Sequence, residues 1–262
     1  MIADMDEAVK TPVKKGLTIF HLKIIAYTTM FIDHVGAFVI QPYTDANLET
    51  MGYRMMRLLD TAYEACRIIG RIAFPLFCFM LVEGLFHTHN RWRYLIRLLI
   101  FAVLSDIPYD LADGGILPNW EKQSVMITLS IGLLVLILME EIKKLTISVN
   151  VRNLLIFLPV AGGALLAYFA KCDYSFRGVL VISALYLLYP LFTLDRKAYV
   201  VGGGILFFWE WMNKYSRVTA SIAYIPLYFY NGEKGKGAKW FFYCFYPVHL
   251  LLLYGIRCYL MR

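Results

Sequence analysis

Long, almost uniformly apolar stretches separated by short polar or glycine-rich connections dominate this sequence. They span residues 18–40, 66–86, 94–112, 125–142, 153–170, 176–194, 198–212, 218–230 and 239–260. A helix that crosses a bilayer needs roughly 20 such residues, and the stretches lack the in-out alternation of membrane barrel strands. We therefore predict an all-α, polytopic transmembrane helix bundle of about nine membrane segments, two of them short or re-entrant.

The composition supports one membrane domain and excludes several other classes. With 60% hydrophobic and only 17% charged residues, the chain has too little polar side chain to cover a soluble domain of this size. Its five cysteines show no CxxC spacing, so we expect neither a disulfide framework nor a metal site. We predict a short cytoplasmic segment at 1–17, followed by a single integral membrane domain at 18–262.

The distribution of positive charge predicts the orientation. When nine spans are drawn, the loops on the side of the N-terminus hold more Lys and Arg than the opposite loops, which places the N-terminus in the cytoplasm. The net charge of +7 fits contact with anionic membrane lipid or with a phosphate-bearing ligand. No basic domain stands clear of the membrane, so we expect no nucleic-acid partner.

The first three apolar stretches also contain ionisable residues that a lipid-facing helix avoids. An intramembrane charge costs on the order of 2.5–3.5 kcal/mol on insertion scales, so these side chains must face inward and pair, or line a wet cavity. One group is expected toward the outer side: Asp33, His34, Arg67, Arg71, Asp106 and Asp110. A second group is expected toward the cytoplasm: Lys23, Glu83 and Arg97. Together they indicate a polar path through the membrane, although structural ion pairs remain an alternative explanation.

The first apolar stretch carries a stripe of side chains at helical spacing. Lys23, Tyr27, Met30 and His34 follow one another at intervals of four, three and four residues, which places them on one helix face. Lys23 and His34 would lie about 16 Å apart along this face. They cannot touch, but they can act at the two ends of one ligand.

Asp33 is expected to have a different partner from its neighbour. Adjacent residues on a helix point about 100° apart, so Asp33 should not orient His34. We predict that Asp33 meets Arg67 or Arg71 instead.

Several motifs follow the order of a known membrane family. They are Leu22-Lys23-Ile24-Ile25-Ala26, Ile32-Asp33-His34-Val35-Gly36, Arg67-Ile68-Ile69-Gly70-Arg71, Ser105-Asp106-Ile107-Pro108-Tyr109-Asp110-Leu111 and Phe245-Tyr246-Pro247-Val248-His249-Leu250. Across nearly the whole chain these blocks resemble the TraX family of membrane proteins. Asp106 stands where glutamate is usual in the family, which preserves the charge.

The resemblance implies an enzyme of the bacterial cytoplasmic membrane. The namesake of the family acetylates the N-terminus of conjugative pilin with acetyl-CoA as donor. The expected partners are therefore acetyl-CoA and an acceptor, either a peptide or a small molecule, that offers an amine or a hydroxyl. The spacing of Lys23 and His34 is also similar to the Arg-x10-His pattern of the acyltransferase-three family, with Lys in place of Arg.

These expectations assign roles at the outer group. His34 is the expected base, or alternatively a transient carrier of the acetyl group. Arg67 or Arg71 would stabilise developing negative charge or hold the acceptor. Three carboxylates would pair with those arginines or recognise a free ammonium: Asp33, Asp106 and Asp110.

The cytoplasmic group is expected to hold the donor. Lys23 and Arg97 suit the phosphates of acetyl-CoA, and Glu83 is the expected counter-ion of one of them. His249 is grouped with the donor site, and a packing role is the alternative. It follows Pro247, whose ring interrupts helix hydrogen bonding and can open a cavity.

The rival interpretation is an ion-coupled transporter or a lipid-translocating protein. Paired intramembrane charges and helices interrupted by Pro or Gly are features of such carriers too. The sequence shows no inverted repeat, which favours the enzyme.

Overall fold

The computed structural model describes residues 15–114, 117–210 and 214–262, so most of the predicted N-terminal segment lies outside the described residues. Within these ranges the chain is helical, and its only β pairing consists of two isolated bridges, Leu17 with Tyr230 and Gln123 with Cys172. The predicted all-α fold is confirmed.

The helices follow one another in the order of the predicted apolar stretches. The first half of the chain forms α1 (Ile19–Val35), the π-helical turn η1 (Gly36–Ile40), α2 (Gln41–Ala46), α3 (Tyr53–Gly70), α4 (Ala73–His87), α5 (Arg91–Asp113) and α6 (Val125–Lys143). The second half forms α7 (Val149–Leu155), α8 (Phe157–Phe169), α9 (Ser175–Leu194), α10 (Arg196–Glu210), α11 (Lys214–Ile222), α12 (Ile225–Tyr228) and α13 (Lys239–Leu260).

Six helical segments in the described part of the chain are long and apolar enough to cross a membrane, and the protein is an integral membrane protein. They run over Ile19–Ala46, Tyr53–His87, Val125–Lys143, Val149–Phe169, Ser175–Phe192 and Trp240–Leu260. The predicted short segment at 218–230 corresponds to a shorter apolar helical stretch, Val218–Tyr228. Helix α5 has 23 residues, but charged side chains occupy both of its ends.

The connection at 41–65 contains more helix than the sequence suggests. It lies outside the predicted apolar stretches, yet it contains α2 and most of the 18-residue helix α3. The charges of Arg54, Arg57, Asp60 and Glu64 lower the apolarity of α3, but they lie on largely exposed positions of an amphipathic helix. The chain bends at Arg71 and Ile72 and continues directly into α4.

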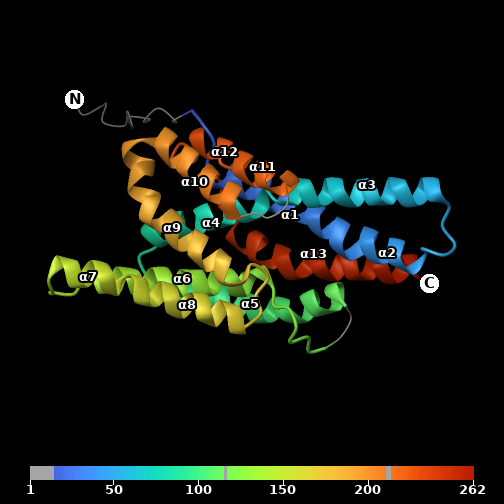
Figure 1. The fold of residues 1–262 in the computed structure, drawn as a ribbon, viewed down its shortest axis with the longest axis horizontal. Helices are drawn as coiled ribbons and strands as arrows, with labels where there is room; N and C mark the ends of the chain where they lie inside the picture. The colour runs from blue at the N-terminus through green and yellow to red at the C-terminus, as the bar shows by residue number, and fades with distance from the viewer. Residues whose placement is uncertain (1–14, 115–116, 211–213) are drawn as a thin grey trace, which may run out of the picture.

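The helices enclose two separate hydrophobic cores. In Figure 1, α5, α6 and α8 lie side by side along one side of the bundle, while α1, α3 and α13 run along the other. The larger core is centred on α4, α6 and α9. The smaller core contains Met30 from α1, Phe38 from η1, Tyr109 from α5, and Tyr246 and Leu250 from α13. The ends of α1 and α5 therefore meet the middle of α13 around this smaller core.

Helices α6 and α8 approach closely because α8 presents a glycine at their contact. A Cβ atom on Gly163 would lie 2.2 Å from Val135 Cγ2, whereas one on the adjacent Gly162 would meet no atom within 4 Å. Small residues at helix contacts are the usual means of close packing inside membranes. Substitutions at these two adjacent glycines therefore distinguish an effect on helix packing from an effect on helix propensity.

We predict that Gly163→Ala destabilises the protein and that Gly162→Ala does not. Overpacking against Val135 should cost about 1–3 kcal/mol, while alanine at the open position should be neutral or gain up to about 1 kcal/mol of helix propensity. The thermal midpoint in detergent measures both. It is followed by reaction of the buried thiols, Cys78 and Cys172, with a fluorogenic dye after the exposed Cys244 and Cys258 have been blocked. Equal midpoints for the two variants would contradict the close α6–α8 contact.

Candidate active site

Asp33 joins the end of α1 to the end of α3 through two arginines. Its Oδ2 accepts from an Arg67 guanidinium nitrogen at 2.7 Å, and its Oδ1 from an Arg71 guanidinium nitrogen at 3.4 Å. The side chains are 16%, 31% and 14% exposed for Asp33, Arg67 and Arg71 respectively. The predicted pairing of Asp33 with these arginines is confirmed, and it offsets intramembrane charge.

This cluster forms because α3 lacks a side chain where it crosses Asp33. A Cβ atom on Gly70 would lie 2.2–2.4 Å from three atoms of the Asp33 side chain. Arg71 follows at the bend toward α4, where its Nε donates to the carbonyl of Arg67 at 3.2 Å. Gly70 thus lets two arginines on successive turns reach one carboxylate.

His34, the next residue of α1, turns away from this cluster toward α13. Its Nδ1 lies 2.7 Å from Nε2 of His249, and the two rings are almost parallel, with an interplanar angle of 3°. His249 is 3% exposed, and its Nδ1 lies 2.8 Å from the carbonyl oxygen of Phe245 one turn earlier. The ring of His34 also contacts those of Phe38 and Tyr246. His34 and His249 therefore form a dyad within the smaller core.

The position of His249 corrects its predicted role. It was assigned to the donor site with Lys23, but it contacts His34 at the opposite end of the predicted path. The two histidines are 215 residues apart in the chain, and helical periodicity carries no signal for a pairing over such a separation.

Asp106 and Asp110 of α5 do not pair with the two arginines, which was one of the two roles predicted for them; recognition of a free ammonium stays a prediction. Oδ2 of the buried Asp110 accepts from the backbone N–H of Asn119 at 2.8 Å. The Oδ1 atoms of Asp106 and Asp110 have no hydrogen-bond partner among the residues that the structure describes. The carboxylate of Asp110 instead holds the loop after α5, for which a backbone N–H is a sufficient donor.

Glu83 also has different partners from those predicted. Its buried carboxylate accepts from the hydroxyls of Tyr230, at 2.8 Å, and Tyr189, and Nδ1 of His87 lies 3.5 Å away. The assignment of Glu83 as counter-ion of Lys23 or Arg97 is wrong, because phenol hydroxyls satisfy the carboxylate. Glu83 stabilises the contact of α4 with α9 and with the end of α12.

The two predicted donor-site cations lie on α1 and α5. Nζ of Lys23 lies 5.0 Å from the ring centre of Phe242 on α13, a cation–π contact. Nε of Arg97 is buried and has no hydrogen-bond partner within the described ranges. Such a donor is suited to an anionic ligand.

Sequence reasoning missed a polar loop that lies near the Asp33 cluster. The loop between α8 and α9 is held by backbone bonds from Asp173 to Gln123 and from Gln123 to Lys171, at 2.9 and 3.0 Å. Loss of hydration raises the pKa of Asp173 above its usual value, although one face of the residue is exposed, and the charges of Lys122 and Arg71 oppose the rise. In the sequence this loop is marked only by the dipeptide Asp173-Tyr174, and two residues between apolar stretches form no periodic pattern that could indicate their neighbours.

A second missed cluster lies at the other ends of α5 and α6. Glu140 accepts from Arg91 at 3.0 Å and from Lys143 at 3.3 Å, and Tyr186 of α9 also donates to it. Arg91 and Lys143 lie just outside predicted apolar stretches, where they count toward the loop charge that predicts the orientation. The cluster links α5, α6 and α9 through these contacts.

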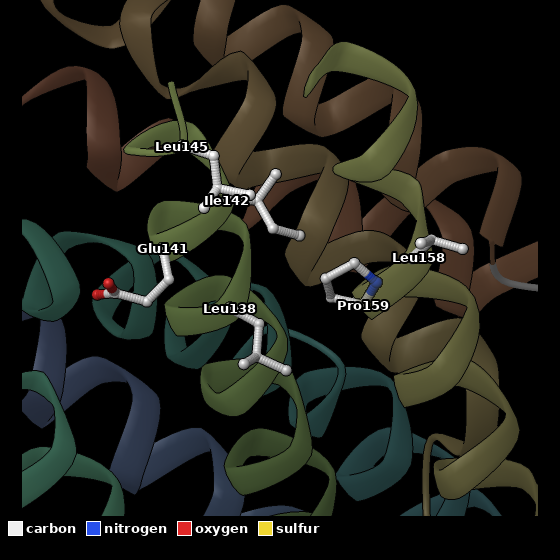
Figure 2. Close-up of a pocket in the computed structure, with 6 residues that line it drawn as sticks. All are labelled: Leu138, Glu141, Ile142, Leu145, Leu158 and Pro159. Atoms are coloured by element: carbon white, nitrogen blue, oxygen red, sulfur yellow. The ribbon is translucent and has the colours of Figure 1, made fainter. Parts of the chain in front are cut away.

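The hollow in Figure 2 lies away from every predicted site residue. It has a volume of 390 Å³ and opens between α6 and the start of α8. Its lining is Leu138, Glu141, Ile142, Leu145, Leu158 and Pro159. With one acid at its edge and otherwise apolar walls, it suits a lipid chain better than the polar reagents of group transfer.

Comparison with known proteins identifies the family. The model of the TraX protein family matches residues 20–257. The chain belongs to the TraX family. This match includes every predicted site residue, from Lys23 to His249. A probable fimbrial assembly protein FimC, serogroup H1, of Dichelobacter nodosus is 30% identical over 260 residues, which cover 92% of this chain and 96% of the relative. No solved structure matches the chain.

In this TraX-family protein, we predict that removing the Asp33 carboxylate destabilises the fold by leaving two guanidinium groups without their acid. Asp33→Asn should cost about 1–3 kcal/mol, less than the roughly 3–5 kcal/mol of a fully buried pair, because Arg67 is partly exposed. The double variant Asp33→Asn/Arg67→Gln should recover part of the loss. Thermal midpoints of both variants measure the coupling.

The exposed ion pair of Lys171 with Glu121, at 3.0 Å, supplies the matched control. Glu121→Gln should leave the midpoint almost unchanged, because surface pairs contribute roughly 0–1 kcal/mol. Equal effects of Asp33→Asn and Glu121→Gln would contradict a structural role for the buried cluster.

Proposed function

We propose that this chain is a membrane acetyltransferase that transfers an acetyl group from acetyl-CoA to an amine, with a peptide N-terminus as the favoured acceptor. The observation that carries the proposal is the His34–His249 dyad, directly beside the ion-paired Asp33. Membership of the TraX family supports acetyl transfer. The name of the FimC relative, a fimbrial assembly protein, supports a pilin-type peptide as acceptor.

His34 is the proposed base. An imidazole can accept a proton near neutral pH, and an ammonium must lose one proton before its nitrogen can attack. In this step the C–N bond forms as the C–S bond of the thioester breaks. The first ammonium proton goes to solvent before the attack. The second proton that the nitrogen loses moves to His34, and the thiolate of coenzyme A leaves and takes up that proton from His34 or from solvent. The second possible sequence begins with attack by His34 itself, which forms an acetyl-imidazole that the amine then attacks.

Arg67 is the better candidate of the two arginines for contact with reagents. A guanidinium has five N–H donors, and the pairing with Asp33 engages only part of them. Because the Arg67 side chain is 31% exposed, its remaining donors can approach the thioester oxygen as negative charge develops.

Lys23 and Arg97 are the proposed contacts for the phosphates of the donor. Lys23 lies about three helical turns before His34 on α1, so the donor would extend along α1 with its thioester near His34. With the N-terminus in the cytoplasm of a bacterial cell, the start of α1 would face the compartment that supplies acetyl-CoA. The surrounding membrane lipid would be the third partner.

We predict that His34→Ala abolishes acetyl transfer. Loss of a positioned base should lower kcat by roughly 10²–10⁴-fold. The assay uses purified protein in detergent with labelled acetyl-CoA and a peptide with a free N-terminus, and it measures both acetyl-peptide and released thiol. His89→Ala, which alters an exposed histidine before α5, should retain full turnover. Near-normal turnover of the His34 variant would remove the assigned base.

We predict that Lys23→Met raises the KM for acetyl-CoA and changes kcat little. The loss of one charge on a phosphate reduces binding of donor and transition state alike. Lys23→Arg keeps the charge and should retain a KM close to that of the unaltered protein. A lower kcat with an unchanged KM would contradict the donor assignment.

Binding and turnover measurements on the same purified protein distinguish an acetyltransferase from a transporter. Saturable acetyl-CoA binding that survives His34→Ala while turnover stops supports the transferase. Absence of both binding and thioester cleavage would overturn it in favour of transport, which uptake into proteoliposomes then tests.

A further inference from the structure

The contact between His34 and His249 fixes which ring nitrogen of each residue carries hydrogen. A hydrogen bond between two imidazoles needs one N–H donor and one nitrogen with a free lone pair. At 2.7 Å, Nδ1 of His34 and Nε2 of His249 share one such proton. The geometry of this pair alone allows either direction.

The third partner decides the direction. Nδ1 of His249 lies 2.8 Å from the carbonyl oxygen of Phe245, and a carbonyl oxygen can only accept. Nδ1 of His249 must therefore carry hydrogen, and in a neutral ring its Nε2 has the free lone pair. His34 is then the donor through its own Nδ1–H.

The reactive nitrogen of His34 follows from this assignment. With Nδ1 protonated, neutral His34 keeps its free lone pair on Nε2, the nitrogen that faces away from His249. His34 is half-buried, whereas His249 is 3% exposed. His34 is thus the less buried of the two histidines, and its outer nitrogen is the one with a lone pair that can accept a proton or attack a carbonyl carbon.

We propose that His249 is a positioning residue that holds His34 in its Nδ1–H tautomer and so presents Nε2 of His34 to the reagents. This inference rests on the proposed function for its reagents, but the tautomer assignment rests on geometry alone. The acceptor nitrogen of His249 does what a carboxylate does for histidine in a Ser-His-Asp triad. When Nε2 of His34 accepts a proton, the bond from Nδ1–H to His249 persists.

Two variants of His249 separate this role from simple packing. His249→Gln retains an acceptor oxygen close to the position of Nε2, whereas His249→Phe retains a ring without any acceptor. Protein labelled with ¹⁵N-histidine, studied by NMR in detergent at a pH where the rings are neutral, reports the tautomer directly. Among the five histidines, the resonances of His34 are those lost in His34→Gln.

The expected spectrum shows hydrogen on Nδ1 and a free lone pair on Nε2 of His34 in the unaltered protein and in His249→Gln. In His249→Phe the ring should shift toward the Nε2–H form. In the transfer assay, His249→Phe should lose roughly 10²–10⁴-fold in kcat, the range for a misdirected base. The KM for acetyl-CoA should stay unchanged, and His249→Gln should recover most of the turnover.

Hydrogen on Nε2 of His34 in the unaltered protein would overturn the proposal, as would His249→Phe with unaltered tautomer and turnover. If the Nδ1–H tautomer is present but the protein neither binds nor cleaves acetyl-CoA, the proposed function fails while the role of His249 in orienting His34 stands. If transfer occurs and the tautomer does not depend on His249, only the positioning role fails.

Discussion

The pairing of Asp33 with Arg67 and Arg71 is the constraint on which the arrangement of the site depends. An isolated charge within an apolar helix is expensive, and it is retained only where an opposite charge can be brought into contact. Here the contact requires α3 to cross α1 without an intervening side chain, which only Gly70 permits. It also requires the chain to bend after Arg71, so that α4 can enter the core while both guanidinium groups stay with the carboxylate.

This constraint also fixes the direction of the next residue. Because successive side chains on a helix diverge by about 100°, the orientation of Asp33 toward α3 turns His34 away from it. His34 therefore enters the smaller core, where α13 supplies His249 and the aromatic rings around the pair. The π-helical turn that begins at Gly36 follows within one turn of His34, and such turns often occur next to functional residues.

The sequence allowed the ion pairs of Asp33 to be predicted, because a buried charge requires an opposite charge. It did not allow the partners of Glu83 and Asp110 to be predicted, because uncharged hydrogen-bond donors satisfy those carboxylates. Asp33 needed cations on a neighbouring helix, and Arg67 and Arg71, four residues apart in the second apolar stretch, supply them. Glu83 needed only hydrogen-bond donors, and tyrosines more than a hundred residues away supply them. Asp110 found a backbone N–H in the following loop. The extent of α3 was underestimated because hydropathy detects membrane-facing helices, whereas α3 is amphipathic and bears charges on its exposed face.

The choice of a second histidine rather than an acid beside His34 follows from the same energetics. A carboxylate would orient the ring equally well, but it would add another charge to an apolar core and require another cation nearby. A neutral imidazole orients His34 through one lone pair and is itself held by a backbone carbonyl of its own helix. The nearby acid, Asp33, is already engaged by the two arginines. Under the proposed function, the site separates its two tasks between adjacent residues of α1, with charge neutralised at Asp33 and proton transfer assigned to His34 and its partner His249.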